Sequence, residues 1–203
     1  MTTRSNSPTP ERRSYAVPLA VRAAEGEPAR RQITGHAAVF NQLSEDLGGF
    51  REKIAPGAFS KSIGGDVRAL WNHNSDLVIG RSVSKTLTLR ETPAGLETVI
   101  TPPDTETARH WLALIERGDV SQMSFGFRTV ADKWERDREN NVTRTLIEVE
   151  LFDVSPVTFP AYPQTDVATR AFDGFKDAER RALGTPIRDR CARDLALLEV
   201  SSN

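Results

Sequence analysis

The chain has few of the residues that build disulfides and metal sites. It contains one cysteine and three histidines in 203 residues. A single cysteine, Cys191, excludes an internal disulfide, and the histidines are not spaced as zinc ligands. No glycine-rich phosphate loop is present, because the Gly-Gly pairs are isolated and indicate turns. We therefore expect a protein of a reducing compartment that uses no metal and no cofactor.

Long apolar runs are also missing. No stretch approaches the roughly 20 consecutive apolar residues that span a bilayer, and residues 1–8 contain no apolar segment of the signal-peptide kind. The formal net charge is −1, so no strong field draws the chain toward nucleic acid or an anionic membrane. These features predict a soluble protein that has neither nucleic acid nor a membrane as its partner.

The chain is instead rich in short segments of alternating or apolar character, which indicate β-strands. Residues 91–95 have the composition of a hairpin turn between two of them, and Ile54–Phe59 leads into a short helix that Gly64-Gly65 ends. The predicted strands cover residues 15–19, 32–40, 67–71, 86–90, 96–101, 123–130 and 144–157. Residues 132–141 are predicted to form a charged connection between the last two.

One longer helix is predicted after Pro102-Pro103. Asp104 or Thr105 can cap its start, and Gly118 ends it. Its apolar stripe, at spacing i, i+3, i+4 and i+7, consists of Ala108, Trp111, Leu112 and Ile115.

The composition divides the chain into three parts. Residues 1–14 are rich in Ser, Thr, Pro and Arg and are predicted to be disordered. Residues 15–170 form the core domain, and residues 171–203 a helical tail with an apolar stripe at Ile187, Cys191, Leu195 and Leu198. The fold class of the core is mainly β with helices (α+β), as a closed or nearly closed β-barrel flanked by helices. A parallel doubly wound sheet would need a helix after nearly every strand.

A serine and a histidine stand in local settings that suggest nucleophilic chemistry. Ser124 lies on a predicted strand whose aromatic residues share the other face, and Gly126 leaves its own face uncrowded. His73 follows a short apolar strand and is flanked by asparagines, which favour turns. An imidazole can take the proton of a hydroxyl that attacks a carbonyl. The alternative is a strand serine bonded to its neighbours and an unrelated, solvated histidine.

A carboxylate is needed to orient the imidazole. In a regular strand Asp153 continues the apolar face that contains Val149 and Leu151. Glu148 and Glu150 fall on the opposite, wet face. A carboxylate on a core face is costly unless it is paired, so Asp153 is the preferred third residue.

This choice assumes an unbroken strand. A bulge near Phe152 would flip every following side chain and favour Glu148 or Glu150 instead. An ordinary salt bridge from Asp153 to an arginine is the other alternative.

Six segments, in this order and spacing over about residues 30 to 165, resemble the prohead (capsid maturation) proteases of tailed bacteriophages. They are Gly35–Asn41, Ile54–Phe59, Leu70–Asn74, Ile79–Arg81, Gly118–Phe127 and Leu151–Ala161. The resemblance implies a serine endopeptidase whose fold is like that of the herpesvirus assembly protease, with helices around a β-barrel. It implies His73 as the general base, Ser124 as the nucleophile and Asp153 as the third catalytic residue.

The resemblance also implies a role. Such an enzyme acts inside the assembling prohead, in the host cytoplasm, and cleaves scaffold protein or the scaffold-like arm of the major capsid protein. It tends to cleave itself as well, and residues 171–203 are a candidate for removal or for scaffold docking. Related viral assembly proteases often need dimerisation, so a homodimer is among the expected partners.

Two other functions fit parts of the pattern. One is a catalytically inactive capsid assembly or scaffold protein that kept the fold, against which the intact His73 and Ser124 argue. The other is a β-barrel binding module in which these two residues are unrelated. Their separation in space decides the second case.

Overall fold

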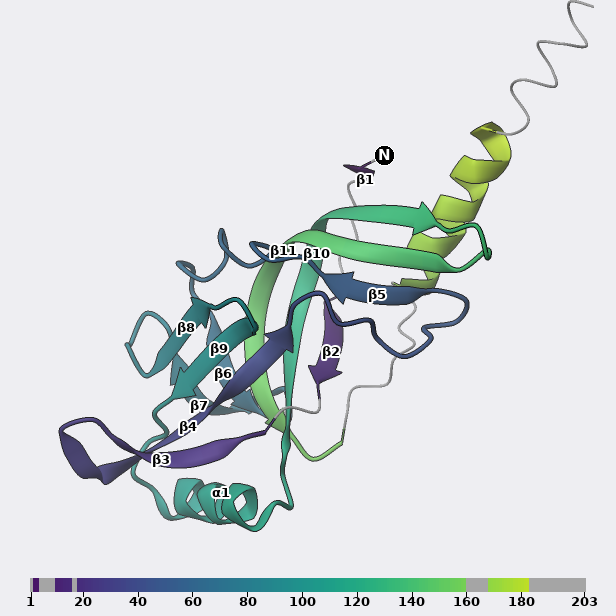
Figure 1. The fold of residues 1–203 in the computed structure, drawn as a ribbon. Coiled ribbons are helices and arrows are strands. Elements are labelled where there is room, and N and C mark those ends of the chain that lie inside the picture. The colour runs from purple at the N-terminus through teal and green to yellow at the C-terminus, as the bar shows by residue number, and fades with distance from the viewer. Residues whose placement is uncertain (1, 4–9, 16–17, 160–167, 183–203) are drawn as a thin grey trace, which may run out of the picture.

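The computed structural model describes residues 2–3, 10–15, 18–159 and 168–182, and these residues form two β-sheets and two helices (Figure 1). The larger sheet contains β1 (Thr2–Thr3), β2 (Glu11–Tyr15), β5 (Arg51–Ile54), β6 (Arg68–Trp71), β7 (Asn74–Arg81), β10 (Gln122–Arg136) and β11 (Val142–Val157). The smaller sheet contains β3 (Ala20–Ala24), β4 (Glu27–Val39), β8 (Leu87–Glu91) and β9 (Gly95–Ile100).

The long hairpin of β10 and β11 organises the larger sheet. These strands pair with each other in antiparallel fashion along most of their length, and Asp137–Asn141 connects them. On its other edge β10 pairs with β2, antiparallel, and with β1. On its other edge β11 pairs with β5 and with β6, both parallel. The hairpin therefore places β2 and β6 on opposite sides of the same pair of strands.

The two sheets share one apolar core. Many of its fully buried members come from β4 and β9 in one sheet and from β10 and β11 in the other, among them Ile33, Leu96, Phe125, Phe127 and Val154. The alternation predicted for β10 is confirmed here, because Met123, Phe125 and Phe127 are all buried in this core. Burying large apolar side chains stabilises a fold by about 1.5–3 kcal/mol each, so this face anchors the strand that carries Ser124.

The helix α1 (Glu106–Arg117) is the predicted one. Thr105 is its N-cap and accepts a hydrogen bond from the Ala108 amide, and Gly118 follows with φ of 84°. The open choice between Asp104 and Thr105 is thus settled for Thr105, whose short side chain reaches back to the first free amides. Gly118 adopts the left-handed conformation that ends helices at low steric cost.

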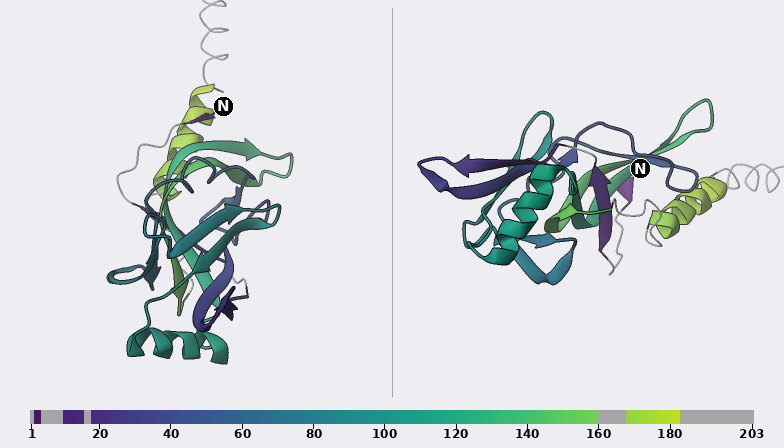
Figure 2. Two further views of the ribbon diagram at one scale, coloured as in Figure 1. Left: turned by 90° about the vertical axis from the view of Figure 1, so that its left-hand side faces the viewer. Right: turned by 90° about the horizontal axis from the view of Figure 1, so that it is seen from below.

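The second helix, residues 168–182, lies at the opposite end of the molecule from α1 (Figure 1, Figure 2). Its Ala168 and Phe172 pack in a smaller apolar cluster with Phe50 and Trp134. The beginning of the predicted tail is therefore helical and docked against the β10–β11 hairpin. The apolar stripe Ile187, Cys191, Leu195 and Leu198 lies outside the described residues, and the division into three parts stays a prediction.

Several local predictions are wrong. The short helix predicted to start at Pro56 and Gly57 is instead a series of turns over residues 56–64, with hydrogen bonds such as Ser60 N to Gly57 O. Residues 11–14, predicted to be disordered, belong to β2, because their alternating charged side chains find buried partners. β10 extends to Arg136, so the connection is shorter than the predicted 132–141. β3, β5 and β7 are strands that the pattern did not indicate. The strand predicted over residues 15–19 is wrong, because β2 ends at Tyr15 and β3 begins at Ala20.

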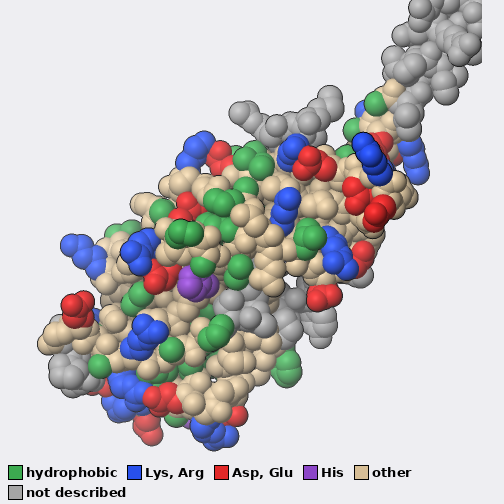
Figure 3. All heavy atoms as spheres, viewed as in Figure 1, with side chains coloured by type: hydrophobic (Ala, Val, Ile, Leu, Met, Phe, Trp, Pro, Cys, Tyr) green, Lys and Arg blue, Asp and Glu red, His purple; other side chains and the backbone are tan. Residues whose placement is uncertain are grey.

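The mainly β architecture with helices is confirmed. The pairings among the described strands give two sheets that pack on a common core, and the closure of the barrel stays a prediction. On the face seen in Figure 3, acidic and basic side chains are interspersed rather than gathered by sign. Within the described residues, neither helix is long and apolar enough to cross a membrane.

Candidate active site

His73 is placed by a two-residue hairpin turn between β6 and β7. Trp71 pairs with Asn74 across the turn, and both residues between them have positive φ, 53° for Asn72 and 57° for His73. Such a turn matches the twist of the strands it joins, and asparagine tolerates its left-handed geometry. Asn72 also holds the turn to Thr158, the residue that follows β11: its Oδ1 accepts from the Thr158 amide at 2.8 Å and its Nδ2 donates to Thr158 Oγ1 at 3.2 Å.

Ser124 lies directly in front of this imidazole. The distance from Ser124 Oγ to His73 Nε2 is 2.6 Å, and that from His73 Nδ1 to Asp153 Oδ1 is 2.5 Å. An ionised carboxylate can only accept a hydrogen bond, so Nδ1 donates to it and Nε2 is left to accept from the serine. Three side chains from β10, β11 and the β6–β7 turn therefore form one hydrogen-bonded chain. The binding-module reading, with an unrelated serine and histidine, is excluded by this contact.

Asp153 reaches the histidine because β11 has a bulge. Gly126 pairs with Asp153 but Phe127 pairs with Leu151, so Phe152 is an extra residue in β11. The bulge puts Asp153 on the face of Ser124 and Gly126, opposite to Leu151. The sequence argument that Asp153 continues the apolar face is therefore wrong, and its chosen acid nevertheless meets His73.

Gly126 provides the space for that carboxylate. A Cβ built on Gly126 would lie 2.2 Å from Asp153 Oδ2. The space beside Gly126, which the sequence suggested would be uncrowded, is thus occupied by the acid of the same site.

Ser155 contacts both the acid and the turn that carries His73. Its Oγ donates to Asp153 Oδ1 at 2.9 Å and accepts from the His73 amide at 3.3 Å. It pairs with Ser124 across the β10–β11 ladder and is fully buried. Ser155 therefore ties the turn that carries His73 to the strand that carries Asp153.

The alternative acids are engaged elsewhere. Glu148 accepts from Lys61 Nζ at 2.7 Å, and Glu150 pairs with Arg128. Arg81 makes two 2.7 Å bonds to Asp66. That pairing lowers the pKa of Asp66, chiefly through the Arg81 hydrogen bond. Each of these charged groups therefore has a partner outside the Ser124–His73–Asp153 chain.

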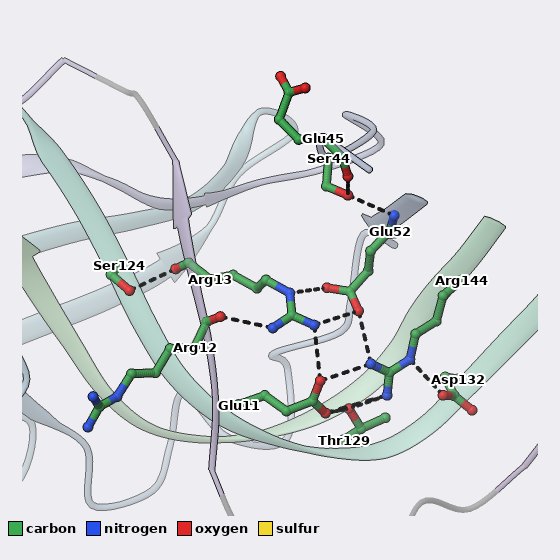
Figure 4. Close-up of polar contacts among 10 residues, drawn as sticks. All are labelled: Glu11, Arg12, Arg13, Ser44, Glu45, Glu52, Ser124, Thr129, Asp132 and Arg144. Carbon is green, nitrogen blue, oxygen red and sulfur yellow. Dashed lines mark hydrogen bonds and ion pairs between the residues drawn. The ribbon is translucent and has the colours of Figure 1, made fainter. Parts of the chain in front are cut away.

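A buried ion cluster lies beside the site, and sequence reasoning missed it. It consists of Glu11, Arg13, Glu52, Asp132 and Arg144, all at most 5% exposed (Figure 4). Arg144 Nε donates to Asp132 at 2.8 Å, and its Nη1 lies 2.9 Å from Glu11 and 3.0 Å from Glu52. Glu11 and Arg13 alternate with exposed residues, as expected for one face of a strand. The polar composition of residues 1–14 instead led to the prediction of disorder.

Attraction between the opposite charges of the cluster offsets the cost of removing them from water. Burial acts to raise the pKa of Glu11, but the charges of Arg144 and Arg13 outweigh it and hold that pKa below its usual value. Burial likewise acts to lower the pKa of Arg13, and Glu52 and Glu11 more than offset it. Glu11, Arg13 and Arg144 therefore remain ionised near neutral pH.

The arrangement can perform acyl transfer. A serine hydroxyl, an imidazole that accepts its proton and a carboxylate that holds the imidazole are the parts of the serine hydrolase triad, which recurs on unrelated folds. Within the described residues, no group of His, Cys, Asp and Glu is arranged to hold a metal ion.

Known proteins resemble this chain in sequence and in fold. The sequence profile of the Caudovirus prohead serine proteases matches residues 17–178. Among solved structures, that of the bacteriophage T4 capsid assembly protease gp21 is similar, with a TM-score of 0.53 at 11% identity over 76% of this chain and 100% of that one. At this identity the likeness shows a shared fold. None of the curated proteins compared with the chain matches it.

Proposed function

Because the chain belongs to the Caudovirus prohead serine protease family, we propose that it is the endopeptidase of capsid maturation and that Ser124, His73 and Asp153 are its catalytic residues. The observation that carries these roles is the unbroken chain of contacts Ser124 Oγ–His73 Nε2–Asp153 Oδ1, at 2.6 and 2.5 Å. A catalytic base must lie within hydrogen-bond reach of the proton it removes, and His73 does.

In this mechanism Ser124 Oγ attacks the carbonyl carbon of the scissile peptide while His73 Nε2 takes its proton. The imidazolium that forms is stabilised by Asp153, which also holds the ring so that Nε2 faces the serine. His73 then returns the proton to the leaving amine. Water hydrolyses the resulting ester by the same steps in reverse order.

The substrates in this proposal are the scaffold protein or the scaffold-like arm of the major capsid protein, and the site of action is the assembling prohead. A homodimer belongs to the same proposal. Removal of scaffold frees internal volume in the shell, which gives an endopeptidase a role before the genome is packaged.

Co-expression with the cognate major capsid and scaffold proteins tests this function. Wild type should shorten at least one of them, and Ser124→Ala, which keeps the small buried side chain, should leave both at full length by intact mass. A serine-directed phosphonate should label wild type at Ser124 and not label His73→Ala. Normal processing by Ser124→Ala would remove this serine from the mechanism, and an unlabelled, inactive wild type would favour a purely structural assembly protein.

A further inference from the structure

The strand β2 lies where a substrate of Ser124 would have to lie. It pairs antiparallel with β10 in the register Ser14 to Ser124 and Arg13 to Phe125. The Oγ of Ser124 lies 2.9 Å from the main-chain carbonyl oxygen of Arg13, so its single proton can point either to this carbonyl or to His73 Nε2 (Figure 4). Peptides commonly bind by adding an extended strand to a sheet edge. The described residues thus already contain one peptide carbonyl at the nucleophile, and it belongs to the chain itself.

Because Ser124 is buried under β2, no other peptide can reach it while β2 is in place. Ser124 is 0% exposed with β2 in place, although it already contacts His73, which contacts Asp153. A carbonyl from another molecule can reach Ser124 Oγ only after β2 has left β10. The occupant of the site is therefore the first peptide that the triad encounters.

The side chain of Arg13 enters a built acidic site. Its Nε donates to Glu52 Oε1 at 2.7 Å and its Nη2 to Glu52 Oε2 at 3.1 Å, and the side chain is 6% exposed. Glu52 comes from β5, far from β2 in sequence. Without Arg13, one oxygen of a nearly buried carboxylate would lose its partner, which is costly. The site therefore favours a cationic side chain on the residue whose carbonyl meets Ser124.

At Glu11, two residues before Arg13, the site favours an acidic side chain. Glu11 accepts from Arg144 Nη1 at 2.9 Å and from Thr129 Oγ1 at 2.6 Å. Arg144 comes from β11 and is fully buried. Alternate residues of a strand share a face, so one extended peptide can present an acidic residue to Arg144 and a basic residue to Glu52. Arg12, between them, is exposed.

We propose that β2 occupies the substrate strand position of the protease and that the site cleaves extended peptides after a basic residue preceded two positions earlier by an acidic one, the bond between Arg13 and Ser14 of its own chain included. This inference rests on the proposed function, because it uses the same triad. It adds the substrate pattern and names one self-cleavage bond.

The cleavage of that bond balances as follows. A bond forms between Ser124 Oγ and the carbonyl carbon of Arg13, and the hydroxyl proton moves to His73 Nε2. The carbon–nitrogen bond to Ser14 then breaks, and His73 gives its proton to the Ser14 nitrogen. One water hydrolyses the Arg13 ester of Ser124. The products are a peptide of residues 1–13 with a new carboxylate and a chain with a new amine at Ser14.

Intact mass spectrometry of the purified full-length chain, followed over time, tests the inference. Wild type should lose residues 1–13 and start at Ser14, and Ser124→Ala should keep them. Because β2 and the triad belong to one molecule, the rate constant should not change over a tenfold range of protein concentration. The same preparation is assayed on the co-expressed capsid and scaffold proteins.

Three variants separate the side-chain pattern from general loss of structure. Arg13→Lys keeps the cation and should be processed at the Arg13–Ser14 position. Arg13→Gln should slow processing at least tenfold. Arg12→Gln, at the exposed position, should behave as wild type. Cleavage of the co-expressed capsid or scaffold protein by Arg13→Gln shows that its triad is still assembled.

The outcomes distinguish this inference from the proposed function. A wild type that shortens the capsid or scaffold protein but keeps residues 1–13 overturns the inference and leaves the function standing. Equal processing of Arg13→Gln and wild type overturns the acidic–x–basic pattern. A wild type that cleaves neither its partners nor itself overturns both.

Discussion

Asp153 lies against the bare Cα of Gly126: a Cβ at position 126 would stand 2.2 Å from Asp153 Oδ2 and 3.2 Å from its carboxyl carbon. Real Cβ atoms do not approach so closely, so any larger residue at 126 forces the carboxylate away. That carboxylate also holds His73 Nδ1 at 2.5 Å. The identity of residue 126 therefore controls the orientation of the imidazole, although Gly126 touches no reacting atom.

Gly126→Ala should nearly abolish proteolysis without unfolding the protein. Loss of the acid's function in a serine triad costs about 10⁴-fold in rate, and we expect a loss of about 10²–10⁴-fold in cleavage of the capsid or scaffold protein. Gly64→Ala is the matched control, since a Cβ there meets nothing within 4 Å. Wild-type cleavage by Gly126→Ala would show that Asp153 is not needed in its present position.

Ser155→Ala should slow the chemical step. The Ser155 hydroxyl donates to Asp153 and accepts from the His73 amide, and a hydrogen bond to a charged group contributes about 1.5–3 kcal/mol. We expect kcat to fall by about 10–100-fold with little change in KM, because Ser155 holds the acid and the turn. Ser60→Ala, at an exposed hydroxyl that donates to the Gly57 carbonyl, should keep wild-type kinetics. A change confined to KM would contradict the positioning role.

Asn72 should matter through its backbone as well as its side chain. Asn72→Ala and Asn72→Gly both remove the two contacts with Thr158. Residue 72 has a φ of 53°, which is sterically unfavourable for alanine and not for glycine. A left-handed conformation costs an ordinary residue about 1–2 kcal/mol relative to glycine. Asn72→Ala should therefore melt lower and cleave more slowly than Asn72→Gly, with melting and cleavage measured side by side. Equal behaviour of the two variants would mean that turn geometry does not limit His73.

The site was predictable from the sequence because the residues next to His73 and Ser124 favour a turn and a strand, respectively. His73 stands between turn-forming asparagines, and Ser124 stands opposite buried aromatics, so both strand-end and strand-face assignments hold. Asp153 was chosen by a parity argument that the bulge at Phe152 makes wrong. A bulge depends on how β11 pairs with β10, and the sequence of β11 alone does not indicate it.

β2 was missed for a related reason. Residues 11–14 are polar, and polar segments rarely bury enough surface to order. Here Glu11 and Arg13 pair with Glu52 and Arg144, which lie 39 to 133 positions away in sequence. Local composition cannot reveal such partners. The fold was therefore predictable in class and in its strongest elements, while the strands held by long-range charge pairs were not.

Glu11 makes the docking of β2 sensitive to acid. Its pKa is below the usual value of 4.5, because the charges of Arg144 and Arg13 outweigh the opposing effect of burial. The folded state then binds fewer protons than the unfolded state between the two pKa values, so this stabilisation is complete above about pH 4.5 and is lost as the pH falls through the folded pKa. We test this with melting curves of the Ser124→Ala protein, which keeps residues 1–13, between pH 7 and pH 3.

In that background Glu11→Gln should be less stable at pH 7 by about 3–5 kcal/mol, because it leaves Arg144 and Arg13 short of one buried partner charge. Its melting temperature should also fall less between pH 5 and pH 3, since the titrating group is gone. Glu135→Gln is the matched control: its pKa is also lowered, mainly by a hydrogen bond from Lys133, but it is exposed. Its curve should follow the parent protein, because exposed ion pairs contribute little. If Glu11→Gln keeps the parent's full acid sensitivity, the carboxylate of Glu11 is not what couples β2 to pH.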